Sequence, residues 1–371
     1  MKRIFLEECC EILDSMRVPI TASDRSVGPY PYYGANGIQD HVADYIFDDE
    51  LVLLAEDGGN FGSKTKPIAY RVSGKCWVNN HAHVLKPKVG IDVDYLCYSL
   101  MFYNTEELVN GATRQKLTQA AMRKMLIPQR TVQEQKNIVS ELSKVQAIIR
   151  LRQRQLQKLD ELVKVRFVEM FGDPATNPKG WTTKPLLEMG YCKNGMNFHT
   201  GDSGMEMHCL GVGDFKDMSV IDGTEHLPVI SLNEAPPEES MLRDGDIVFV
   251  RSNGNKALVG RCLVVYPHNT PTTYSGFCIR YRLTSNEVVV DYLLRVLKAD
   301  SMRKKMAGRG VNIQNLNQQI LASLYIPLPP IKLQEQFAAF VEQVNKSKVA
   351  VQKALNEAQL LFDSLMQQYF S

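Results

Sequence analysis

The stretch that decides the fold runs from Gln133 to Phe171 and reads QEQKNIVSELSKVQAIIRLRQRQLQKLDELVKVRFVEMF. Its apolar residues recur at alternating steps of four and three, the pattern that winds one long helix around another. The same pattern returns with a constant offset, from Ile138 to Phe337 (337 − 138 = 199). We therefore predict two long helices that pack against each other as an antiparallel coiled coil.

Each predicted helix has a defined seam. The first seam consists of Ile138, Leu142, Val145, Ile149, Arg152, Leu156, Leu159 and Val163, and continues to Arg166 and Met170. The second consists of Phe337, Val341, Val344, Lys348, Val351, Leu355 and Phe362, and includes Ala358, Leu365 and Tyr369. The three seam cations, Arg152, Arg166 and Lys348, either fix the alignment of the helices or meet a partner protein, because charge at a seam costs stability. The plainer alternative is that their stems lie along a loose seam with the charged ends in water.

The segments ahead of the two helices also resemble each other. Ile127-Pro128 and Ile326-Pro327 precede the helices with the same offset of 199 (326 − 127), and Val-Asp-Tyr-Leu occurs at both 93–96 and 290–293. The sequence thus predicts an α+β fold with a pseudo-two-fold internal repeat. Its expected parts are a mixed α/β domain at 1–110, a helical segment at 111–172, a second mixed domain at 173–307 and a second helical segment at 308–371.

The composition is that of an ordinary globular protein. The formal net charge is only +2, although residues 114–166 contain 13 Lys and Arg against 4 Asp and Glu, so positive charge gathers on the first helical segment. No apolar run is long enough to span a membrane, and no C-x-x-C pair occurs among the eight cysteines. We expect a cytoplasmic protein with reduced thiols and no membrane segment.

A stem that carries two related domains suits a target with two separated parts. Half-sites on duplex DNA recur about 34–36 Å apart on one face. Antiparallel helices also relate the two domains by a pseudo-two-fold axis, like the local dyad of the duplex backbone. Because the domains differ in sequence, each is expected to recognise a different half-site.

Two polar loop regions offer groups that bind DNA. Arg and Lys contact guanine or phosphate, and Asn contacts adenine. The candidates are Lys64, Lys66, Asn79, Asn80, His81 and His83 in the first domain, and Arg251, Ser252, Asn253, Asn255, Lys256, Arg261 and Tyr274 in the second. For any single Asn or Gly here, a role as a turn residue is the plainer interpretation.

The motifs that would indicate catalysis are incomplete. The stretch 58–65 resembles a phosphate-binding loop, but Ser63 separates Gly62 from Lys64, which the motif requires to be adjacent. His81 and His83 lack a neighbouring cluster of cysteines or carboxylates in sequence. We predict no catalytic residue and no metal site.

Several phrases in this order resemble the specificity subunit of Type I restriction–modification systems, over the whole chain. They are Tyr32-Tyr-Gly-Ala-Asn-Gly37, Trp77-Val-Asn-Asn-His-Ala-His83, Phe171-Gly-Asp-Pro174 and a Gln-Glu-Gln after each Ile-Pro. The two Gln-Glu-Gln phrases lie 201 residues apart (334 − 133), which predicts a two-residue adjustment near Pro329-Pro330.

The resemblance implies that each mixed domain reads one part of a bipartite, asymmetric DNA target. It implies that the helices form a spacer and dock two methylation subunits. S-adenosylmethionine, ATP and magnesium would be bound by partner subunits, including a restriction and translocation subunit where one joins, and this chain would catalyse nothing itself. Two alternatives remain open: a coiled-coil adaptor that binds only proteins, and a DNA-recognition fragment of a modification enzyme.

Overall fold

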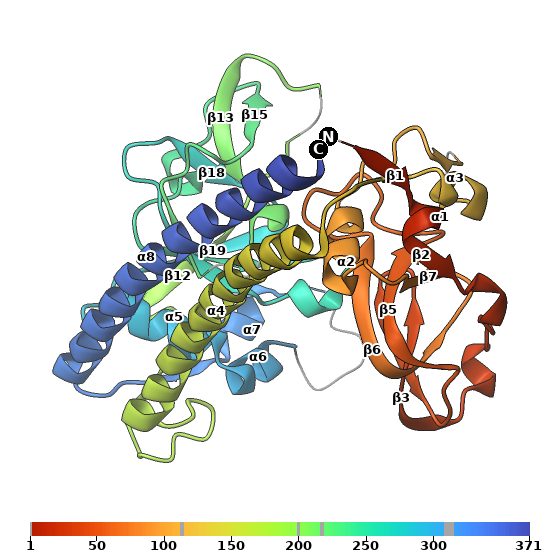
Figure 1. The fold of residues 1–371 in the computed structure, drawn as a ribbon. Coiled ribbons are helices and arrows are strands. Elements are labelled where there is room, and N and C mark those ends of the chain that lie inside the picture. The colour runs from red at the N-terminus through yellow and green to blue at the C-terminus, as the bar shows by residue number, and fades with distance from the viewer. Residues whose placement is uncertain (1, 112–114, 199–200, 216–218, 308–314) are drawn as a thin grey trace. The chain divides into compact units, whose positions relative to one another are not determined.

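The computed structural model describes residues 2–111, 115–198, 201–215, 219–307 and 315–371 (Figure 1). Its contacts divide the chain into two compact units. Unit 1 comprises Met1–Arg154 and Val351–Ser371, and unit 2 comprises Gln155–Ala350. Each unit contains one sheet-rich domain and a part of both long helices. The four-segment division stays a prediction, and its boundary at residue 308 lies outside the described residues.

The two long helices have equal length and the predicted offset. Helix α4 spans Val132–Phe171 and helix α8 spans Ile331–Phe370, 40 residues each. Their first residues and their last residues both differ by 199 (331 − 132 and 370 − 171). At about 1.5 Å per residue, each is about 60 Å long. A capping box opens α4: Glu134 N–H donates to Thr131 Oγ1 over 3.3 Å, and Thr131 N–H donates to Glu134 Oε2 over 2.7 Å.

Unit 1 is built on a six-stranded sheet with the order β2-β7-β5-β6-β3-β4. The strands are β2 (Cys10–Ile12), β3 (Val27–Gly34), β4 (Gly37–Val42), β5 (Phe47–Ala55), β6 (Ala69–Val78) and β7 (Ala82–Pro87). Helix α2 (Val93–Met101) packs against β5 and β6 (Figure 1). The smaller elements are β1 (Arg3–Phe5), α1 (Leu6–Cys9), β8 (Val109–Asn110), β9 (Lys116–Leu117), α3 (Gln119–Arg123) and β10 (Leu126–Pro128).

Unit 2 repeats this sheet. Its five-stranded sheet has the order β12-β19-β16-β17-β14, formed by β12 (Gly190–Asn194), β14 (Val220–Asp222), β16 (Asp246–Val250), β17 (Cys262–Tyr266) and β19 (Cys278–Leu283). The first three pairings are antiparallel and the last is parallel, as in the sequence β2-β7-β5-β6-β3 of unit 1. The repeat therefore extends to strand order and direction.

Unit 2 also has elements beyond this shared sheet. A second, three-stranded sheet contains β13 (Met205–Leu210), β15 (Val229–Leu232) and β18 (Thr272–Tyr274). The remaining elements are β11 (Thr183–Pro185), α5 (Val290–Lys298), α6 (Asp300–Ala307), α7 (Gln318–Ala322) and β20 (Tyr325–Pro327).

The Ile-Pro phrases close each unit in the same way. Ile127 pairs with Ile4 where β10 meets β1, and Ile326 pairs with Lys184 where β20 meets β11. A buried tyrosine then donates a hydrogen bond to the carbonyl of each proline. Tyr95 Oη donates to the Pro128 carbonyl over 2.7 Å, and Tyr292 Oη donates to the Pro327 carbonyl over 2.9 Å. Each tyrosine belongs to the repeated Val-Asp-Tyr-Leu phrase, so this phrase places the helix of each sheet domain beside the start of a long helix.

A buried glutamine fixes α4 to the sheet domain of unit 1. Gln135 is 1% exposed, and its amide makes three hydrogen bonds to the backbone. It donates to the carbonyl oxygens of Gly90 and Arg130, both over 3.0 Å, and accepts from the N–H of Asp92 over 2.8 Å. The side chain thus ties the first turn of α4 to the loop that opens α2.

Gln334 does the same for α8 in unit 2. It donates to the carbonyl oxygens of Glu287 over 3.1 Å and Pro329 over 2.8 Å, and accepts from the N–H of Val289 over 2.9 Å. Its side chain is also buried. The two glutamines bind equivalent backbone groups, because the loop at 287–289 opens α5 as the loop at 90–92 opens α2.

The equivalence corrects the alignment of the Gln-Glu-Gln phrases. Gln135 corresponds to Gln334 (334 − 135 = 199), so no two-residue adjustment near Pro329-Pro330 is needed. The third residue of one phrase matches the first residue of the other. Identical letters misled the sequence comparison, whereas burial and hydrogen bonding identify the equivalent side chains.

The helices pack antiparallel within unit 2. Lys348 Nζ lies 2.8 Å from Asp160 Oδ1, and seven residues further along α4 the ring of Phe167 lies 5.5 Å from that of Phe337. Residue numbers therefore rise along one helix as they fall along the other. Phe171 and Tyr292 complete the aromatic cluster, with ring centroids 4.7 Å apart.

Most seam residues lie in the interior of their unit. The structure buries Ile138, Leu142, Val145, Ile149, Val163, Phe337, Val341, Val344, Val351 and Phe362, and half-buries Leu156, Leu159 and Leu355. The expected continuation to Arg166 is wrong, because Arg166 is exposed and pairs with Glu169. The inward side chains there are Phe167 and Phe171, which follow Val163 at steps of four. That step lets this end of α4 face the sheet domain as well as α8.

The seam cations have different surroundings. Lys348 pairs with Asp160 of the facing helix, which suits a role in alignment. Both side chains are partly exposed, so the pair contributes little to stability. Arg152 is half-buried, and a partner-binding role for it stays a prediction.

The cysteines form no disulfide. All eight cysteines are free, and burial raises the pKa of Cys10 to about 12, which keeps this thiol protonated. In the part of the chain that the structure describes, no helix is long and apolar enough to cross a membrane.

The glutamine clamp can be tested with Gln135→Met, which keeps the length of the side chain and removes its hydrogen bonds. Three backbone groups then lose their partner, so we expect a loss of about 2–4 kcal/mol in the free energy of unfolding, measured by urea denaturation. Gln133→Met, at an exposed position of the same helical turn, is the control and should change it by less than about 0.5 kcal/mol. Equal effects of the two substitutions would contradict the clamp.

Candidate nucleic-acid interface

Three loops of unit 1 meet at one end of the six-stranded sheet. The loop after β5 and the β6–β7 turn join where Glu56 N–H donates to the His81 carbonyl over 2.9 Å. The β3–β4 turn reaches the same place, since Asn36 Nδ2 donates to the Gly58 carbonyl over 2.9 Å. Gly37 has a φ of 108°, a conformation that favours glycine in this turn. Five of the six candidate residues of the first domain lie on two of these loops, and His83 lies in β7.

The structure separates those candidates by exposure. Lys64, Lys66 and Asn80 are exposed, and His81 is half-buried with Nδ1 2.5 Å from Asp57 Oδ1. Asn79 is buried: its Nδ2 donates to Gln39 Oε1 over 3.0 Å, and its Oδ1 accepts from the His81 N–H over 2.8 Å. Asn79 therefore shapes the turn, and exposure leaves Lys64, Lys66, Asn80 and His81 as candidates for DNA contact.

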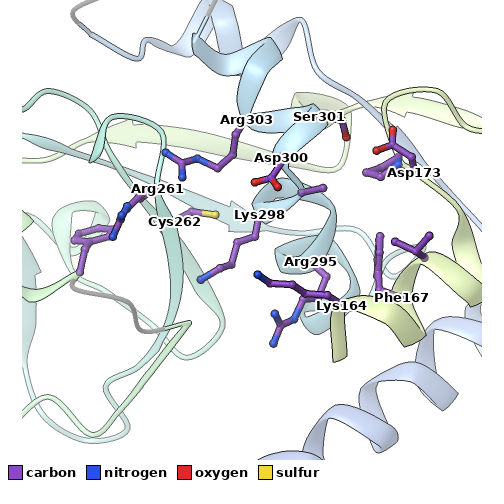
Figure 2. Close-up of a pocket in the computed structure, with 14 residues that line it drawn as sticks. Lys164, Phe167, Asp173, Arg261, Cys262, Arg295, Lys298, Asp300, Ser301 and Arg303 are labelled. Carbon is purple, nitrogen blue, oxygen red and sulfur yellow. The ribbon is translucent and has the colours of Figure 1, made fainter. Parts of the chain in front are cut away.

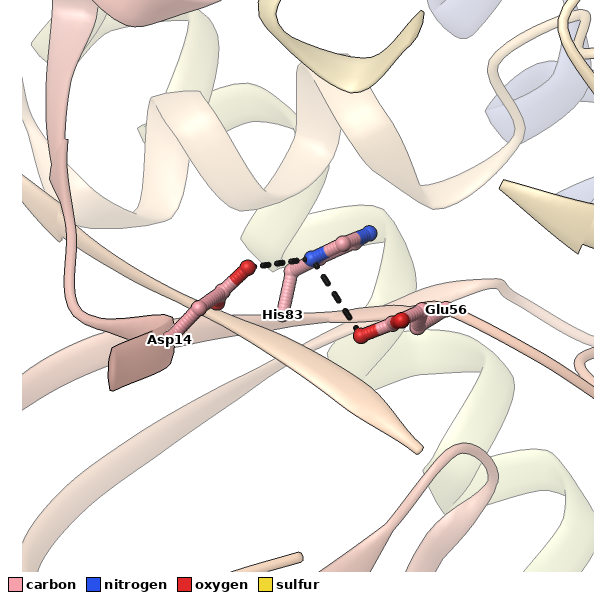
Figure 3. A group of neighbouring side chains, drawn as sticks. All are labelled: Asp14, Glu56 and His83. Carbon is pink, nitrogen blue, oxygen red and sulfur yellow. Dashed lines mark hydrogen bonds and ion pairs between the residues drawn. The ribbon is translucent and has the colours of Figure 1, made fainter. Parts of the chain in front are cut away.

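His83 lies inside the domain and not on its surface. Its side chain is 0% exposed, with Nδ1 2.7 Å from Asp14 Oδ2 and Nε2 2.9 Å from the Leu117 carbonyl. Figure 3 shows the imidazole between Asp14 and Glu56, and the Glu56 carboxylate lies 3.7 Å from Nδ1. This placement contradicts the expectation that His83 faces solvent or DNA.

The same three side chains could in principle hold a metal ion, because their ligand atoms lie within 4.8 Å of one another. The surrounding cations argue against it. Arg17 NH1 lies 2.6 Å from Glu56 Oε2, and Lys116 Nζ lies 3.1 Å from Glu56 Oε1. Both imidazole nitrogens already have partners. The cluster is therefore better described as a charge-compensated structural network than as a cation site.

The network favours an ionised Asp14. Burial opposes ionisation, but the hydrogen bond and charge of His83, the Val84 N–H and the Gln119 amide outweigh it, so the pKa of Asp14 lies below its usual value. This contribution to stability is complete above the unfolded-state pKa of Asp14. It is lost as the pH falls through the lower folded-state pKa.

The second loop region, in unit 2, occupies a position equivalent to that of the first. Residues 251–256 follow β16 as the loop at 56–66 follows β5, and β16 and β5 are equivalent strands. Arg251 N–H donates to the Phe277 carbonyl over 2.8 Å, and its guanidinium donates to the Gly276 carbonyl over 3.3 Å. Ser252 forms a β-bridge with Asn315. The loop is thus held against the β18–β19 turn.

Two of the candidate asparagines also build this loop. Asn253 Oδ1 accepts from the N–H of Asn255 over 2.8 Å, and Asn255 Oδ1 accepts from the N–H of Ala257 over 3.1 Å. These are the turn contacts that the plainer interpretation predicts. Lys256 is exposed and Arg261 is half-buried. Tyr274 is fully buried with its hydroxyl donating to the Lys193 carbonyl over 3.3 Å, so this position argues against a DNA contact by Tyr274.

Sequence reasoning missed an exposed aromatic residue beside this loop. The residue is Phe277, which directly precedes the start of β19 at Cys278, and its side chain is 61% exposed. The Phe277 carbonyl accepts the Arg251 N–H, so an aromatic ring and a guanidinium lie on adjoining turns. An exposed aromatic side chain can stack on a base or insert between base pairs. The Ser275-Gly276 turn before it was the available signal.

Comparison with known proteins agrees with this architecture. The family model for the type I restriction modification DNA specificity domain matches residues 1–161 and 241–359, and the chain belongs to this family. It is 27% identical to the "Putative type I restriction enzyme specificity subunit S.HindORF215P" of Haemophilus influenzae, over 91% of this chain and 86% of that protein. It is 26% identical to the type I restriction enzyme StySPI specificity subunit of Salmonella potsdam, over 86% of this chain and 72% of that protein.

A solved structure shows the same fold. The crystal structure of the type I restriction–modification system S subunit from M. genitalium aligns with 100% of this chain and 96% of that chain, with a TM-score of 0.58 and 14% identity. The match to a specificity-subunit structure, together with the family repeat, confirms the expected fold class of two sheet-rich mixed domains with long helices.

His83→Leu tests the internal position of this histidine. The substitution removes the imidazole partner of the Asp14 carboxylate, which keeps only the Val84 N–H and the Gln119 amide, and the imidazole partner of the Leu117 carbonyl. We expect a loss of about 3 kcal/mol in the free energy of unfolding at neutral pH. Acid should also destabilise the variant less than the wild type, because the stabilisation of ionised Asp14 is already reduced. Urea denaturation across the acid range measures both effects.

Asn80→Leu, at an exposed position of the β6–β7 turn that precedes this strand, is the control and should unfold like the wild type. A His83→Leu protein with wild-type stability but impaired DNA binding would contradict an internal structural role for His83.

Proposed function

We propose that this chain is the DNA-reading subunit of a type I restriction–modification complex and recognises a bipartite, asymmetric target. The observation that supports it most directly is the doubled architecture. Each unit has the same sheet order and the same glutamine clamp, with Gln135 and Gln334 in equivalent positions. The loops after β5 and β16 differ in sequence. Two equivalent frames with different loops suit two different half-sites.

In unit 1, reading is assigned to the exposed members of the predicted set. Lys64 and Lys66 supply charge for the phosphate backbone, and Asn80 and His81 supply groups for base edges. The network around His83 lies in the strand that follows the β6–β7 turn, and Asn79 fixes the turn itself. The exposed lysines, Lys64 and Lys66, thus belong to a loop that meets a turn held by hydrogen bonds.

In unit 2, Arg251 and Phe277 are the principal proposed contacts. An arginine can pair with guanine in the major groove, and the exposed ring can stack on an unpaired base. Ser252, Asn253, Asn255 and Lys256 surround Arg251 on the same loop and complete the proposed surface. A base that is to be methylated must leave the duplex stack, so an aromatic side chain near the reading loop suits the reaction of a partner subunit.

The long helices are proposed to dock two methylation subunits. In unit 2, Leu162, Val165 and Val168 project apolar side chains from α4 into solvent, and in unit 1, Ile148 and Leu151 do the same. Exposed apolar groups along a helix suit a helical partner surface. S-adenosylmethionine, ATP and magnesium are assigned to the methylation and restriction subunits. This chain is assigned no catalysis, and we place it in the cytoplasm with its DNA target.

The two alternatives make different demands. An adaptor that binds only proteins would use the exposed apolar positions of α4 but has no need for two reading loops. A recognition fragment of a modification enzyme would methylate or cleave DNA without separate subunits. The relatives are named specificity subunits, which favours the proposed role over both alternatives.

The proposal predicts salt-sensitive binding to DNA by the assembled complex. Each neutralised phosphate releases a counterion, so a complex that makes several phosphate contacts loses affinity by about 10³ or more between 50 and 200 mM salt. Fluorescence anisotropy with the target duplex measures this slope for the chain plus its methylation subunits. Binding to methylation subunits with no affinity for any duplex would support the protein adaptor. Methylation or cleavage by the chain alone would support the enzyme fragment.

Phe277→Ala tests the aromatic contact in unit 2. Loss of one stacked base contact costs about 1–3 kcal/mol, so we expect affinity for the target duplex to fall by roughly five- to 150-fold. Tyr325→Ala removes an aromatic ring of similar exposure from β20, away from the loop, and is the matched control. Unchanged affinity in the Phe277→Ala complex, with a normally folded chain, would exclude the contact.

A further inference from the structure

A partly open cavity of about 450 Å³ lies in unit 2, and none of the loop residues 251–256 lines it. Helix α4, the turn that follows it, the start of β17 and helices α5 and α6 enclose it (Figure 2). Its volume falls within the range of small-molecule sites, which is about 300–1,000 Å³. Two of its lining residues have appeared above, Val168 as a proposed docking residue and Arg261 as a candidate DNA contact, but no ligand has been assigned to the cavity itself.

Cations dominate its lining. They are Lys164 of α4, Arg261 beside β17, Arg295 and Lys298 of α5, and Arg303 of α6. The lining has two carboxylates, Asp173 and Asp300, so the formal balance is +3 (five minus two). Figure 2 shows the ends of Lys164, Arg295 and Lys298 close together, with Asp173 on the other side of the view. The positive charge is therefore concentrated at one end of the cavity.

Internal hydrogen bonds engage part of the lining. Lys298 Nζ donates to Ser219 Oγ over 2.8 Å. Asp173 Oδ1 accepts the N–H groups of Ala175 and Thr176, so this carboxylate is engaged in the turn after α4. Among the described residues, no hydrogen bond or ion pair reaches the guanidinium of Arg295. Arg303 donates to two carbonyl oxygens, those of Ala257 over 3.0 Å and Val259 over 3.3 Å, but its Nε is buried without a partner in the described structure.

The electrostatics of α5 point the same way. Burial lowers the pKa of Lys298, and Arg295, Arg261 and Arg303 lower it further. Burial also lowers the pKa of Arg295, although Asp160 and Asp291 oppose this. Like charges gathered in a partly enclosed space raise the free energy of the folded protein. A bound anion would offset that cost.

The cavity lining also has an apolar part. It is supplied by Phe167 and Val168 of α4, Pro174 and Phe215. Phe167 and Phe215 are themselves buried, so these rings are held in place by the core. Figure 2 shows Phe167 beside Lys164 and Arg295, and cations next to a fixed aromatic ring match a ligand with a phosphate group and a flat ring.

We infer that this cavity binds a nucleotide, with its phosphate at Arg295, Lys298 and Lys164 and its base or sugar against Phe167. The nucleotide is either free in solution or part of bound DNA, and both sources present the same chemistry. Only the second source depends on the proposed DNA-reading function. A cavity that merely holds water around its cations predicts no saturable binding of either kind.

The first experiment uses the full chain and isothermal titration calorimetry with pyrophosphate and with AMP. We expect saturable binding of at least one of these probes by the wild type, and binding at least tenfold weaker in Lys164→Gln and in Arg295→Gln. Lys164 is exposed on α4, so that variant keeps the fold even where the half-buried Arg295 disturbs it. Lys304→Gln, on α6 but outside the cavity lining, is the control and should bind like the wild type.

The second experiment measures duplex affinity of the assembled complex for the same variants. A tenfold loss in Lys164→Gln and Arg295→Gln, with Lys304→Gln unchanged, identifies DNA as the source of the nucleotide even where free probes do not bind. Wild-type duplex affinity in both cavity variants, together with no binding of pyrophosphate or AMP, overturns the inference. A wild-type complex that binds no duplex refutes the DNA-reading function alone, and the calorimetry then decides the cavity.

Discussion

One buried glutamine in each unit fixes a sheet domain to the start of a long helix, and the arrangement of the functional loops depends on it. A glutamine that satisfies three backbone groups in the interior has few alternative positions, because each lost hydrogen bond leaves a buried polar group unpaired. Gln135 and Gln334 make the same set of contacts. The tyrosine-to-proline hydrogen bonds add a second link at each place. A reading loop can specify DNA only when its frame is rigid relative to the helix that presents it.

The repeat was the most predictable part of this protein. The offset of 199 predicted the corresponding positions of α4 and α8 and of the Ile-Pro strands. The loops at 56–66 and 251–256 follow equivalent strands with an offset of 195 (251 − 56). These features depend on local periodicity and on matched phrases, which a single sequence contains. The alignment of the Gln-Glu-Gln phrases was wrong because it matched identical residues in order, whereas the equivalent residues are the two buried glutamines, Gln135 and Gln334. The seam prediction was wrong at Arg166 because a helix that packs on a sheet domain departs from a strict heptad pattern.

The individual site residues were less predictable. His83 lies in β7 beside Val84 and Leu85, and the first four residues of this strand are all buried. A strand that is covered on both faces shows no alternation of polar and apolar residues, so the sequence did not indicate that His83 is internal. Tyr274 lies in a strand that is buried throughout. Phe277 has the composition of a core residue, yet the chain turns at Gly276 and exposes its ring. Exposure at these positions is set by contacts distant in sequence, so residue type alone indicated neither burial nor access.

We propose that this chain positions its partner subunits on DNA through two loops that differ in sequence, each on one of two equivalent sheet domains. The most direct test is methylome sequencing of the host with the chain present and deleted. The account predicts one interrupted, asymmetric motif, with a methylated adenine in each of its two parts, that disappears on deletion. A single continuous motif, or a methylome unchanged by the deletion, would contradict it.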